Sequence, residues 1–493
     1  MRIVIVASAM LALGLTASTT LSSAADRNAR DLAGVWRAKA SVARLMPMDG
    51  KALPFTAEGR ARYEKISAGL KSGVIVDQAV YLCLPEGMPR AMTSAYPFQI
   101  MLTPGQLTFA HEANPFYRIV NLTDKHADPN FWDPSYMGDG IAKWQGDKLV
   151  IDSTNFKAER IYLDASGLPV SDQLHLTERI RLIDGGKQLE DLITVTDPVI
   201  FAKPWTARRT FERRDDIELK TDWMCGEPHR DVSARPKLPA TAASTARMPD
   251  RHDSRALTAG QMALNGYWRH PSYAAPGGAI RTGGAAPGTG PMAGVVAKLQ
   301  PWASAVFAQA KEIEATGEFW YTPTNRCIPA VVPGIGVPYG THILVEPHQV
   351  TFLYELNRTM RLVHIDQKHP AEVAPSWLGH SVGHWEGETL VVDTIGFNDK
   401  NVLANGVPMT SRMHIVQRLR MVNGKLEERT TFDDPGALTG IFEKNLLHEK
   451  GAPFQEYVCA ENNLEGGVPT STGQYTPPTM PKARASAEKP ATR

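Results

Sequence analysis

The sequence is poor in cysteine, carries almost no net charge and has no long apolar run after its first residues. Its 53 lysines and arginines balance 52 aspartates and glutamates, which gives a formal charge of +1. A chain this close to neutrality has no field that attracts polyanions, so neither nucleic acid nor an anionic membrane is expected as a partner. Phosphate-binding loops and dinucleotide fingerprints are also absent, and no cofactor is predicted.

The one long apolar run lies at the N-terminus. Residues 3–15 follow Arg2, and Thr/Ser-rich sequence then ends in Ala24 and Ala25. This order is typical of a secretory signal peptide over residues 1–25, and its apolar core is shorter than the roughly 20 residues that a membrane anchor needs. We therefore expect a periplasmic or secreted protein that has no integral membrane segment once the signal is removed.

The rest of the chain contains two diverged copies of one unit. Residues 138–156 and 379–397 share Gly, Trp, Gly, Leu, Val, Asp and Phe in one register, and Trp144 lies 241 positions before Trp385. Further matches precede and follow this pair, so nearly the whole mature chain is covered twice. The duplication predicts two domains of the same fold.

Composition marks the boundaries of these domains. We predict the first over residues 26–230 and the second over residues 261–463, since a chain this long exceeds the roughly 250–300 residues of a single core. Residues 231–260, rich in Ala, Pro, Ser, Thr and Arg, are predicted as a linker. The Gly-rich residues 274–294 are predicted as a mobile loop inside the second copy, and residues 464–493 as a disordered tail.

Short segments that alternate apolar and polar residues recur in each copy, as expected of half-buried strands. They cover residues 106–111, 117–122, 148–153, 174–182 and 189–196 in the first copy, and 349–354, 360–365, 389–394, 413–421 and 426–432 in the second. About eight strands per copy, joined by turns, fit an antiparallel sheet that closes on itself. One short helix per copy is predicted, over residues 56–70 and 302–316. The predicted fold class is all-β, with two tandem antiparallel β-barrels.

The four cysteines follow the duplication. In an exported chain, cysteines without CxxC spacing favour disulfides over metal or redox chemistry. Cys83 and Cys225 lie 142 positions apart, and Cys327 and Cys459 lie 132 apart. Three pairings are possible in principle, and the duplication favours Cys83–Cys225 and Cys327–Cys459, each tying the first loop of a copy to its last strand.

The densest polar and aromatic stretch contains Trp377, His380, His384 and Trp385, just before a predicted strand. Such a stretch suits the mouth of a barrel, where ligand sites are common. His380 is a candidate acid or base because the pKa of an imidazole lies near neutrality. His380 and His384 are four residues apart, but the glycines around them argue against the helix that would bring them to one face, and no third ligand follows. No metal site is therefore predicted.

Residues that only the second copy has are the better functional candidates, because what both copies keep serves the architecture. Four histidines of the second copy replace other residues of the first: His342 for Gln99, His364 for Asn121, His380 for Asp139 and His384 for Lys143. Two further histidines recur in both copies and are interpreted as scaffold hydrogen bonders: His126 with His369, and His175 with His414.

A carboxylate and a guanidinium also recur on neighbouring predicted strands, as Glu112 with Arg118 and Glu355 with Arg361. Opposite charges in these places favour a cross-strand ion pair. The alternative is that each pair orients a ligand carbonyl or carboxylate inside a cavity. On this second interpretation Glu355 joins His364 and His380 as a candidate catalytic residue.

The stretch Gly379-His-Ser-Val-Gly-His-Trp-Glu-Gly-Glu-Thr-Leu-Val-Val-Asp-Thr resembles a motif of a large group of exported bacterial proteins, frequent in sphingomonads and acidobacteria. At His384 the group more often has Arg, a departure that weakens a two-histidine metal site. The duplicated unit also looks similar to calycin or lipocalin-type barrels. Tandem bacterial versions of these are linked to hydration and isomerisation of lipophilic compounds, and the resemblance implies lipocalin-like domains.

Three functions stay open at this stage, and the sequence does not decide whether the protein is an enzyme. The first is binding of a hydrophobic or aromatic small molecule in the second barrel, near Trp377, Trp385, His380, His384, Arg361 and His342. The second is a cofactor-independent lyase, isomerase or hydrolase for a lipophilic substrate, with His380 and either His364 or Glu355 as acid and base. The third is a structural module that contacts another component of the envelope.

Overall fold

The computed structural model describes residues 30–81, 84–113, 116–214, 216–221, 256–269, 294–317, 329, 339–404, 406–453 and 455–459. The predicted signal peptide and tail lie outside these residues, as do most of the predicted linker and Gly-rich loop. Three of the four cysteines, Cys83, Cys225 and Cys327, lie outside them too. Among the described helices, none has the length and apolarity needed to cross a bilayer.

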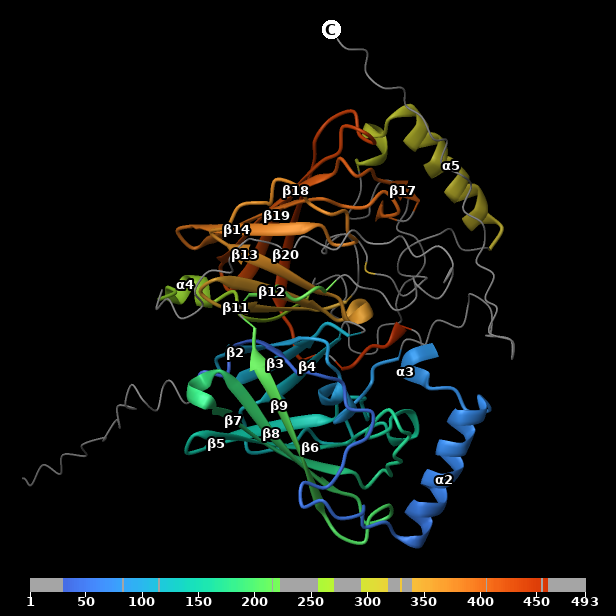
Figure 1. Cartoon of the computed structure of the whole chain (residues 1–493). Helices are drawn as coiled ribbons and strands as arrows, with labels where there is room; N and C mark the ends of the chain where they lie inside the picture. The colour runs from blue at the N-terminus through green and yellow to red at the C-terminus, as the bar shows by residue number, and fades with distance from the viewer. Residues whose placement is uncertain are drawn as a thin grey trace, which may run out of the picture.

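Two closed β-barrels make up most of the described chain (Figure 1). The first consists of β1 (Gly34–Arg37), β2 (Phe98–Thr103), β3 (Gln106–His111), β4 (Phe116–Asn121), β5 (Asp139–Gln145), β6 (Lys148–Thr154), β7 (His175–Ile183), β8 (Gln188–Thr196) and β9 (Trp205–Arg213). The second consists of β10 (Gly266–Arg269), β11 (Thr341–Val345), β12 (Gln349–Tyr354), β13 (Met360–Ile365), β14 (His380–Glu386), β15 (Thr389–Ile395), β18 (His414–Val422), β19 (Lys425–Asp433) and β20 (Phe442–Lys450). The predicted all-β tandem barrels are therefore confirmed.

Each barrel has nine strands, one more than the sequence predicts. The short strands β1 and β10, of four residues each, close the barrels: β1 pairs with both β2 and β9, and β10 with both β11 and β20. A separate two-stranded sheet is formed by β16 (Val402–Ala404) and β17 (Val407–Pro408).

One neighbouring pair in each barrel is parallel, where the sequence predicts only antiparallel pairs. Val120 of β4 lies beside Gly140 of β5, and Val363 of β13 lies beside Ser381 of β14. Parallel neighbours need a connection that returns along the barrel, which a hairpin cannot provide. Residues 122–138 and 366–379 are these connections, and each carries one of the recurring histidines, His126 or His369.

The motif shared by the copies is explained by this part of the fold. Gly146 and Gly387 have φ of 65° and 62° in the hairpin turns after β5 and β14, a conformation that glycine adopts without strain. Gly138 and Gly379 also have positive φ, and a Cβ at Gly138 would lie 2.5 Å from the ring of Phe156. The recurring glycines and phenylalanine therefore fix the backbone around the parallel strands.

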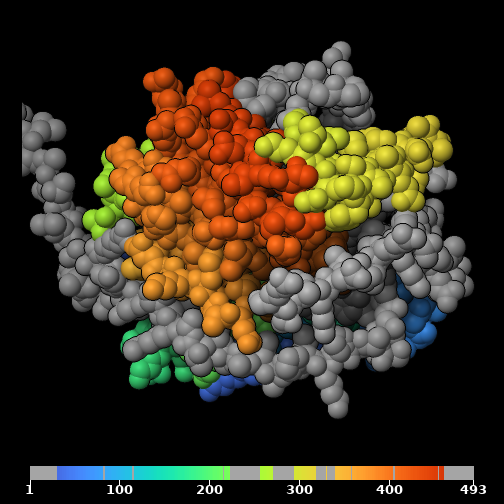
Figure 2. Space-filling view, turned by 90° about the horizontal axis from the view of Figure 1, so that it is seen from above, coloured from blue at the N-terminus to red at the C-terminus, as the bar shows by residue number. Residues whose placement is uncertain are grey.

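One long helix accompanies each barrel, as predicted. These are α2 (Ala57–Ser72) and α5 (Pro301–Ala315), and they lie on the same side of their barrels (Figure 1). Thr56 begins α2 by accepting a hydrogen bond from the backbone N–H of Gly59 (2.9 Å), and Pro301 stands at the first turn of α5. Figure 2 shows α5 (yellow) beside the strands of the second barrel. Two helices of four residues, α3 (Gln78–Tyr81) and α4 (Ala259–Met262), were not predicted.

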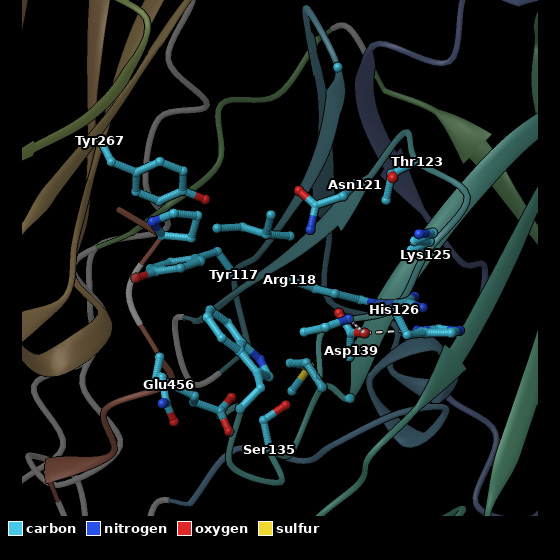
Figure 3. Close-up of a pocket in the computed structure, with 18 of the residues that line it drawn as sticks. Tyr117, Arg118, Asn121, Thr123, Lys125, His126, Ser135, Asp139, Tyr267 and Glu456 are labelled. Carbon is cyan, nitrogen blue, oxygen red and sulfur yellow. Dashed lines mark hydrogen bonds and ion pairs between the residues drawn. The ribbon is translucent and has the colours of Figure 1, made fainter. Parts of the chain in front are cut away.

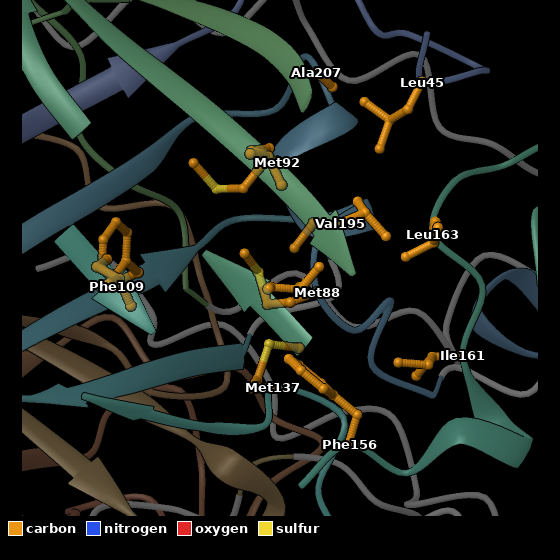
Figure 4. Packing of buried hydrophobic residues seen from close by; sticks show 14 of the residues in the cluster. Leu45, Met88, Met92, Phe109, Met137, Phe156, Ile161, Leu163, Val195 and Ala207 are labelled. Atoms are coloured by element: carbon orange, nitrogen blue, oxygen red, sulfur yellow. The ribbon is translucent and has the colours of Figure 1, made fainter. Parts of the chain in front are cut away.

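Alternation along the strands separates an inward from an outward set of side chains. On β13, Val363 and Ile365 belong to the core of the second barrel, whereas Met360 and Leu362 face the first barrel. The core of the first barrel is one large apolar cluster of residues from many strands and loops (Figure 4). Because successive side chains of a strand point to opposite faces, His364 shares the outward face with Leu362 and Arg361 shares the inward face with Val363.

The two barrels pack through the outward faces of β2–β4 and β11–β13. Apolar side chains at this contact include Met101, Ala110, Tyr117, Leu219, Leu344, Leu353, Met360 and Leu362. Polar groups add hydrogen bonds: the Gln99 amide donates to Gln349 Oε1 (3.2 Å), and the Tyr117 hydroxyl donates to the carbonyl of Tyr354 (3.1 Å). The interface is thus a mixed apolar and polar surface between equivalent strands.

The copies also exchange their ends. After β9 closes the first barrel, Glu218 contacts His364 of the second barrel and Leu219 joins the inter-barrel cluster. After β20 closes the second barrel, Glu456 accepts a hydrogen bond from the backbone N–H of Tyr136 (2.6 Å), and Val458 is buried in the core of the first. Cys459, the last described residue, is disulfide-bonded to a partner outside the described residues.

Candidate functional site

Two of the histidines found only in the second copy come together on its outer face. His364 lies on β13, and His380 begins the parallel neighbour β14. Their rings are stacked with centroids 5.5 Å apart. The parallel pairing of two strands that are separated by a long connection therefore makes neighbours of residues sixteen positions apart.

Glu218 completes this group from the exchanged end of the first copy. His364 Nε2 lies 2.6 Å from Glu218 Oε1, and one ligand atom each from Glu218, His364 and His380 lie within 4.8 Å of one another. His364 is buried, and the other two are half-buried. Glu218 was not among the predicted site residues, because its segment follows the first barrel in sequence and nothing in the local pattern indicates a crossing to the second.

His380 is the end of a chain of hydrogen bonds. Its Nδ1 lies 2.8 Å from Nδ1 of His369, and His369 Nε2 lies 3.0 Å from Asp393 Oδ1. The other oxygen of Asp393 lies 2.9 Å from Nε2 of His414. A carboxylate only accepts, so a neutral His369 donates from Nε2 and accepts at Nδ1. His380 must then donate from Nδ1, which leaves the lone pair of the imidazole on Nε2.

The surroundings of His380 keep it uncharged near neutral pH. Burial lowers the pKa of His380 to about 4, and the neighbouring His364 and His369 add to the shift, while Glu218 opposes it. A neutral imidazole with a defined tautomer is able to accept a proton or to ligate a metal ion. This distinguishes His380 from an ordinary exposed histidine.

The first copy has the same arrangement with a carboxylate in place of His380. His126 Nδ1 lies 2.8 Å from Asp139 Oδ2, and its Nε2 lies 2.9 Å from Asp152 Oδ1. His175 Nε2 lies 2.7 Å from the other oxygen of Asp152. Burial alone would lower the pKa of His126, but the hydrogen bonds to Asp152 and Asp139 outweigh it and raise the pKa. The recurring histidines therefore act as hydrogen bonders of the scaffold. His126 joins the carboxylates of Asp139 and Asp152, an arrangement that we call the ionic clamp.

A cleft of about 510 Å³ lies where the first barrel meets the second (Figure 3). Tyr267 and Glu456 approach from one side, and residues of the first barrel and its crossover connection approach from the other. Three aromatic side chains line it: Tyr117, Trp132 and Tyr267. The hydroxyl of Tyr267 accepts a hydrogen bond from the Gln106 amide (3.2 Å), so this ring is held in place across the interface.

Charged groups also line this cleft. Arg358 of the second copy is buried, and it donates to Glu456 and to the backbone carbonyl of Tyr117. Lys125 lies at the exposed rim, and Asp139 is held by His126. The cleft therefore combines aromatic walls with one accessible cation at its edge.

Several predicted site residues belong neither to the group of Glu218, His364 and His380 nor to the cleft between the barrels. His384 is exposed on β14 and contacts Glu386 (3.4 Å); four residues along a strand separate it from His380 by about 13 Å. That separation is too long for His380 and His384 to bind the same metal ion. Trp377 is only 3 % exposed, and Trp385 packs against the core of the second barrel. His342 is buried against the ring of Tyr267, with centroids 3.9 Å apart.

The predicted cross-strand pairs of Glu and Arg are wrong. Arg361 is 1 % exposed inside the second barrel, where it donates to Ser381 Oγ, Gln417 Oε1 and Thr394 Oγ1 at 2.9, 2.6 and 2.6 Å. Arg118 pairs with Glu178 inside the first barrel. These guanidiniums point inward from their strands, so their partners are groups in the barrel interior and not Glu112 or Glu355.

Glu355 lies too far from His364 to belong to the predicted catalytic set. Its carboxylate accepts a hydrogen bond from the backbone N–H of Gly340 (2.7 Å) just beyond the end of β12. His364 pairs with Gln349 at the other end of that strand, which puts about 20 Å between them. Glu218 stands beside His364 in its place.

A comparison with models of known protein families and one with curated proteins gave no match to this chain.

Proposed function

We propose that this protein binds a small aromatic or lipophilic molecule with an acidic group, in the cleft between the two barrels. The observation that carries the proposal is the convergence of three aromatic rings from both copies, Tyr117, Trp132 and Tyr267, around one hollow. Aromatic walls with a few placed polar groups are the usual composition of small-molecule sites.

The size of the cleft supports this proposal. Sites for organic ligands usually measure about 300–1,000 Å³, and this cleft of about 510 Å³ falls within that range. The ring of Tyr267 is fixed by Gln106 and that of Tyr117 by the Tyr354 carbonyl. Side chains that are already held lose little freedom on binding, which favours affinity.

The charges favour an acidic group on the ligand. Arg358 is already engaged with Glu456 and with a backbone carbonyl, whereas Lys125 at the rim faces solvent. A ligand whose ring lies against Trp132 and whose acid points outward meets Lys125 first. Attraction of such a group to an exposed ammonium is modest, so the aromatic contacts supply most of the affinity.

This proposal keeps the predicted ligand class but moves the site. The residues first expected around the ligand are divided by the barrel wall, with Arg361 facing the interior and His380 facing outward. One molecule cannot contact both through the wall. The described cleft lies outside the barrels and uses residues of both copies.

The test is calorimetric titration of the full mature chain with 2-naphthoate and with its neutral amide. We expect saturable binding of the acid, a loss of at least about tenfold in affinity in Trp132→Ala, and a smaller loss in Lys125→Gln that removes the preference for acid over amide. Trp302→Ala is the matched control, because Trp302 is 44 % exposed on α5. Equal affinity in Trp132→Ala and wild type, or no binding of either compound, would contradict the proposal.

A further inference from the structure

We propose that Glu218, His364 and His380 together bind one divalent transition-metal ion, with zinc as the best-suited member. This inference does not rest on the cleft proposed above as a ligand site, because the three residues lie on the outer face of the second barrel and none of them lines that cleft. Two imidazoles and one carboxylate are a donor set that zinc and non-haem iron sites use.

The spacing of the three groups fits one ion. Their ligand atoms lie within 4.8 Å of one another, and His364 Nε2 and Glu218 Oε1 are 2.6 Å apart. Bonds of about 2.0–2.1 Å in a tetrahedral zinc site place neighbouring ligand atoms roughly 3.3 Å apart. Small rotations of the half-buried Glu218 and His380 side chains would bring the observed ligand-atom distances to those of a zinc site. The ion then takes the place of the proton between His364 and Glu218.

The second observation is that His380 is already oriented as a ligand. Histidines that bind metals almost always donate their other N–H to a fixed acceptor. His380 does so through Nδ1 toward His369, which is itself anchored to Asp393 at 3.0 Å. The lone pair on Nε2 of His380 is thereby fixed in direction by the hydrogen bonds that run back to Asp393.

The first copy has no histidine at the two equivalent positions, which supports the assignment. The positions of His364 and His380 are held there by Asn121 and Asp139, and Asp139 is bonded to His126 and to the backbone N–H of Ala127. The same scaffold without the two imidazoles forms an ionic clamp. The two histidine ligands are therefore found only in the second barrel, and together with Glu218 they leave a coordination position for water or a substrate.

A consequence of the exchanged chain end is that this ion would join the two copies. Glu218 follows the last strand of the first barrel, and both histidines belong to the second. Metal binding is then expected to raise the thermal unfolding midpoint of the whole chain, because a ligand that binds only the folded state stabilises it.

The experiment is calorimetric titration of the chelator-treated full mature chain with zinc chloride, with cobalt(II) absorption as a second readout. We expect about one equivalent to bind. His364→Asn, which installs the residue of the first copy, and His380→Ala should each weaken binding by at least about tenfold, and Glu218→Gln should weaken it as well. His384→Ala is the control and should leave binding unchanged, because His384 is exposed and lies about 13 Å along the strand.

Three results would overturn this assignment. One is wild-type protein that binds no zinc; another is a stoichiometry near one that survives both His364→Asn and His380→Ala. The third is an effect of His384→Ala that equals theirs. Because Asn is the natural residue at this place in the first barrel, His364→Asn is expected to fold. A far-ultraviolet circular dichroism spectrum identical to that of wild type checks this.

Discussion

Asp139 and His380 occupy equivalent positions in the two barrels, and each lies 2.8 Å from Nδ1 of the histidine in its own crossover connection. With Asp139, the partner His126 stands between two carboxylates and carries a raised pKa. With His380, the partner His369 has one carboxylate and one imidazole. A single difference between the copies therefore replaces a histidine held between two carboxylates by a hydrogen-bond chain that ends at His380.

The substitution Asp139→His should make the first copy behave like the second. It removes one of the two carboxylates that raise the pKa of His126, so that pKa should fall relative to wild type, as measured by histidine NMR titration. A pKa raised by folding stabilises the native state below the unfolded value of about 6.5, and this stabilisation disappears as pH rises through the folded value. The variant should thus lose more stability at pH 5 than at pH 8, and an equal loss at both would contradict the clamp.

The buried guanidiniums predict an asymmetric response to mutation. Arg118 pairs with Glu178, and both are almost fully buried. Arg118→Ala leaves that carboxylate unpaired and should cost about 3–5 kcal/mol in urea unfolding. Glu178→Gln should cost less, because the second barrel uses Gln417 at this place, and its amide oxygen accepts from Arg361 at 2.6 Å.

Asp191 provides a check on that second variant. Burial, followed by the charge of Glu178, raises the pKa of Asp191 well above its ordinary value. In Glu178→Gln the negative charge at position 178 is lost. Asp191 can then ionise and supply the carboxylate that balances the charge of Arg118. Equal destabilisation by Glu178→Gln and Arg118→Ala would show that Asp191 does not take over.

Val458 predicts that the C-terminal end stabilises the first barrel. This side chain is 6 % exposed within the core of the first copy, although it follows the second in sequence. Val458→Ala should cost roughly 1–2 kcal/mol by opening a small cavity. Hydrogen exchange should accelerate in strands of the first barrel, with little effect of the control Leu447→Ala, which is 41 % exposed. Faster exchange in the second barrel alone would contradict the exchange of ends.

Local pattern was enough to locate most of the scaffold. Period-two alternation marks β3 and β12 at their observed bounds, Gln106–His111 and Gln349–Tyr354, and helix-forming composition places α2 and α5 within two residues. The same alternation separates Arg361 from His364, because an odd number of positions puts them on opposite faces. The interior and exterior sets of side chains on this strand were therefore already encoded in the sequence.

The crossing of chain ends had no local signal. Residues 216–221 show neither alternation nor helical periodicity, and their place depends on packing against the other copy. For that reason Glu218 stayed hidden, whereas subtracting the first copy from the second did single out His364 and His380. The parallel strands likewise depend on a long connection, whose path local preferences do not fix.

The most direct test of the proposed function is a crystal structure of the mature protein soaked with a brominated naphthoate. The account predicts anomalous density for bromine in the cleft between the barrels, with the ring against Trp132 and Tyr267 and the carboxylate toward Lys125. Density inside the second barrel beside Arg361, with none in the cleft, would contradict it.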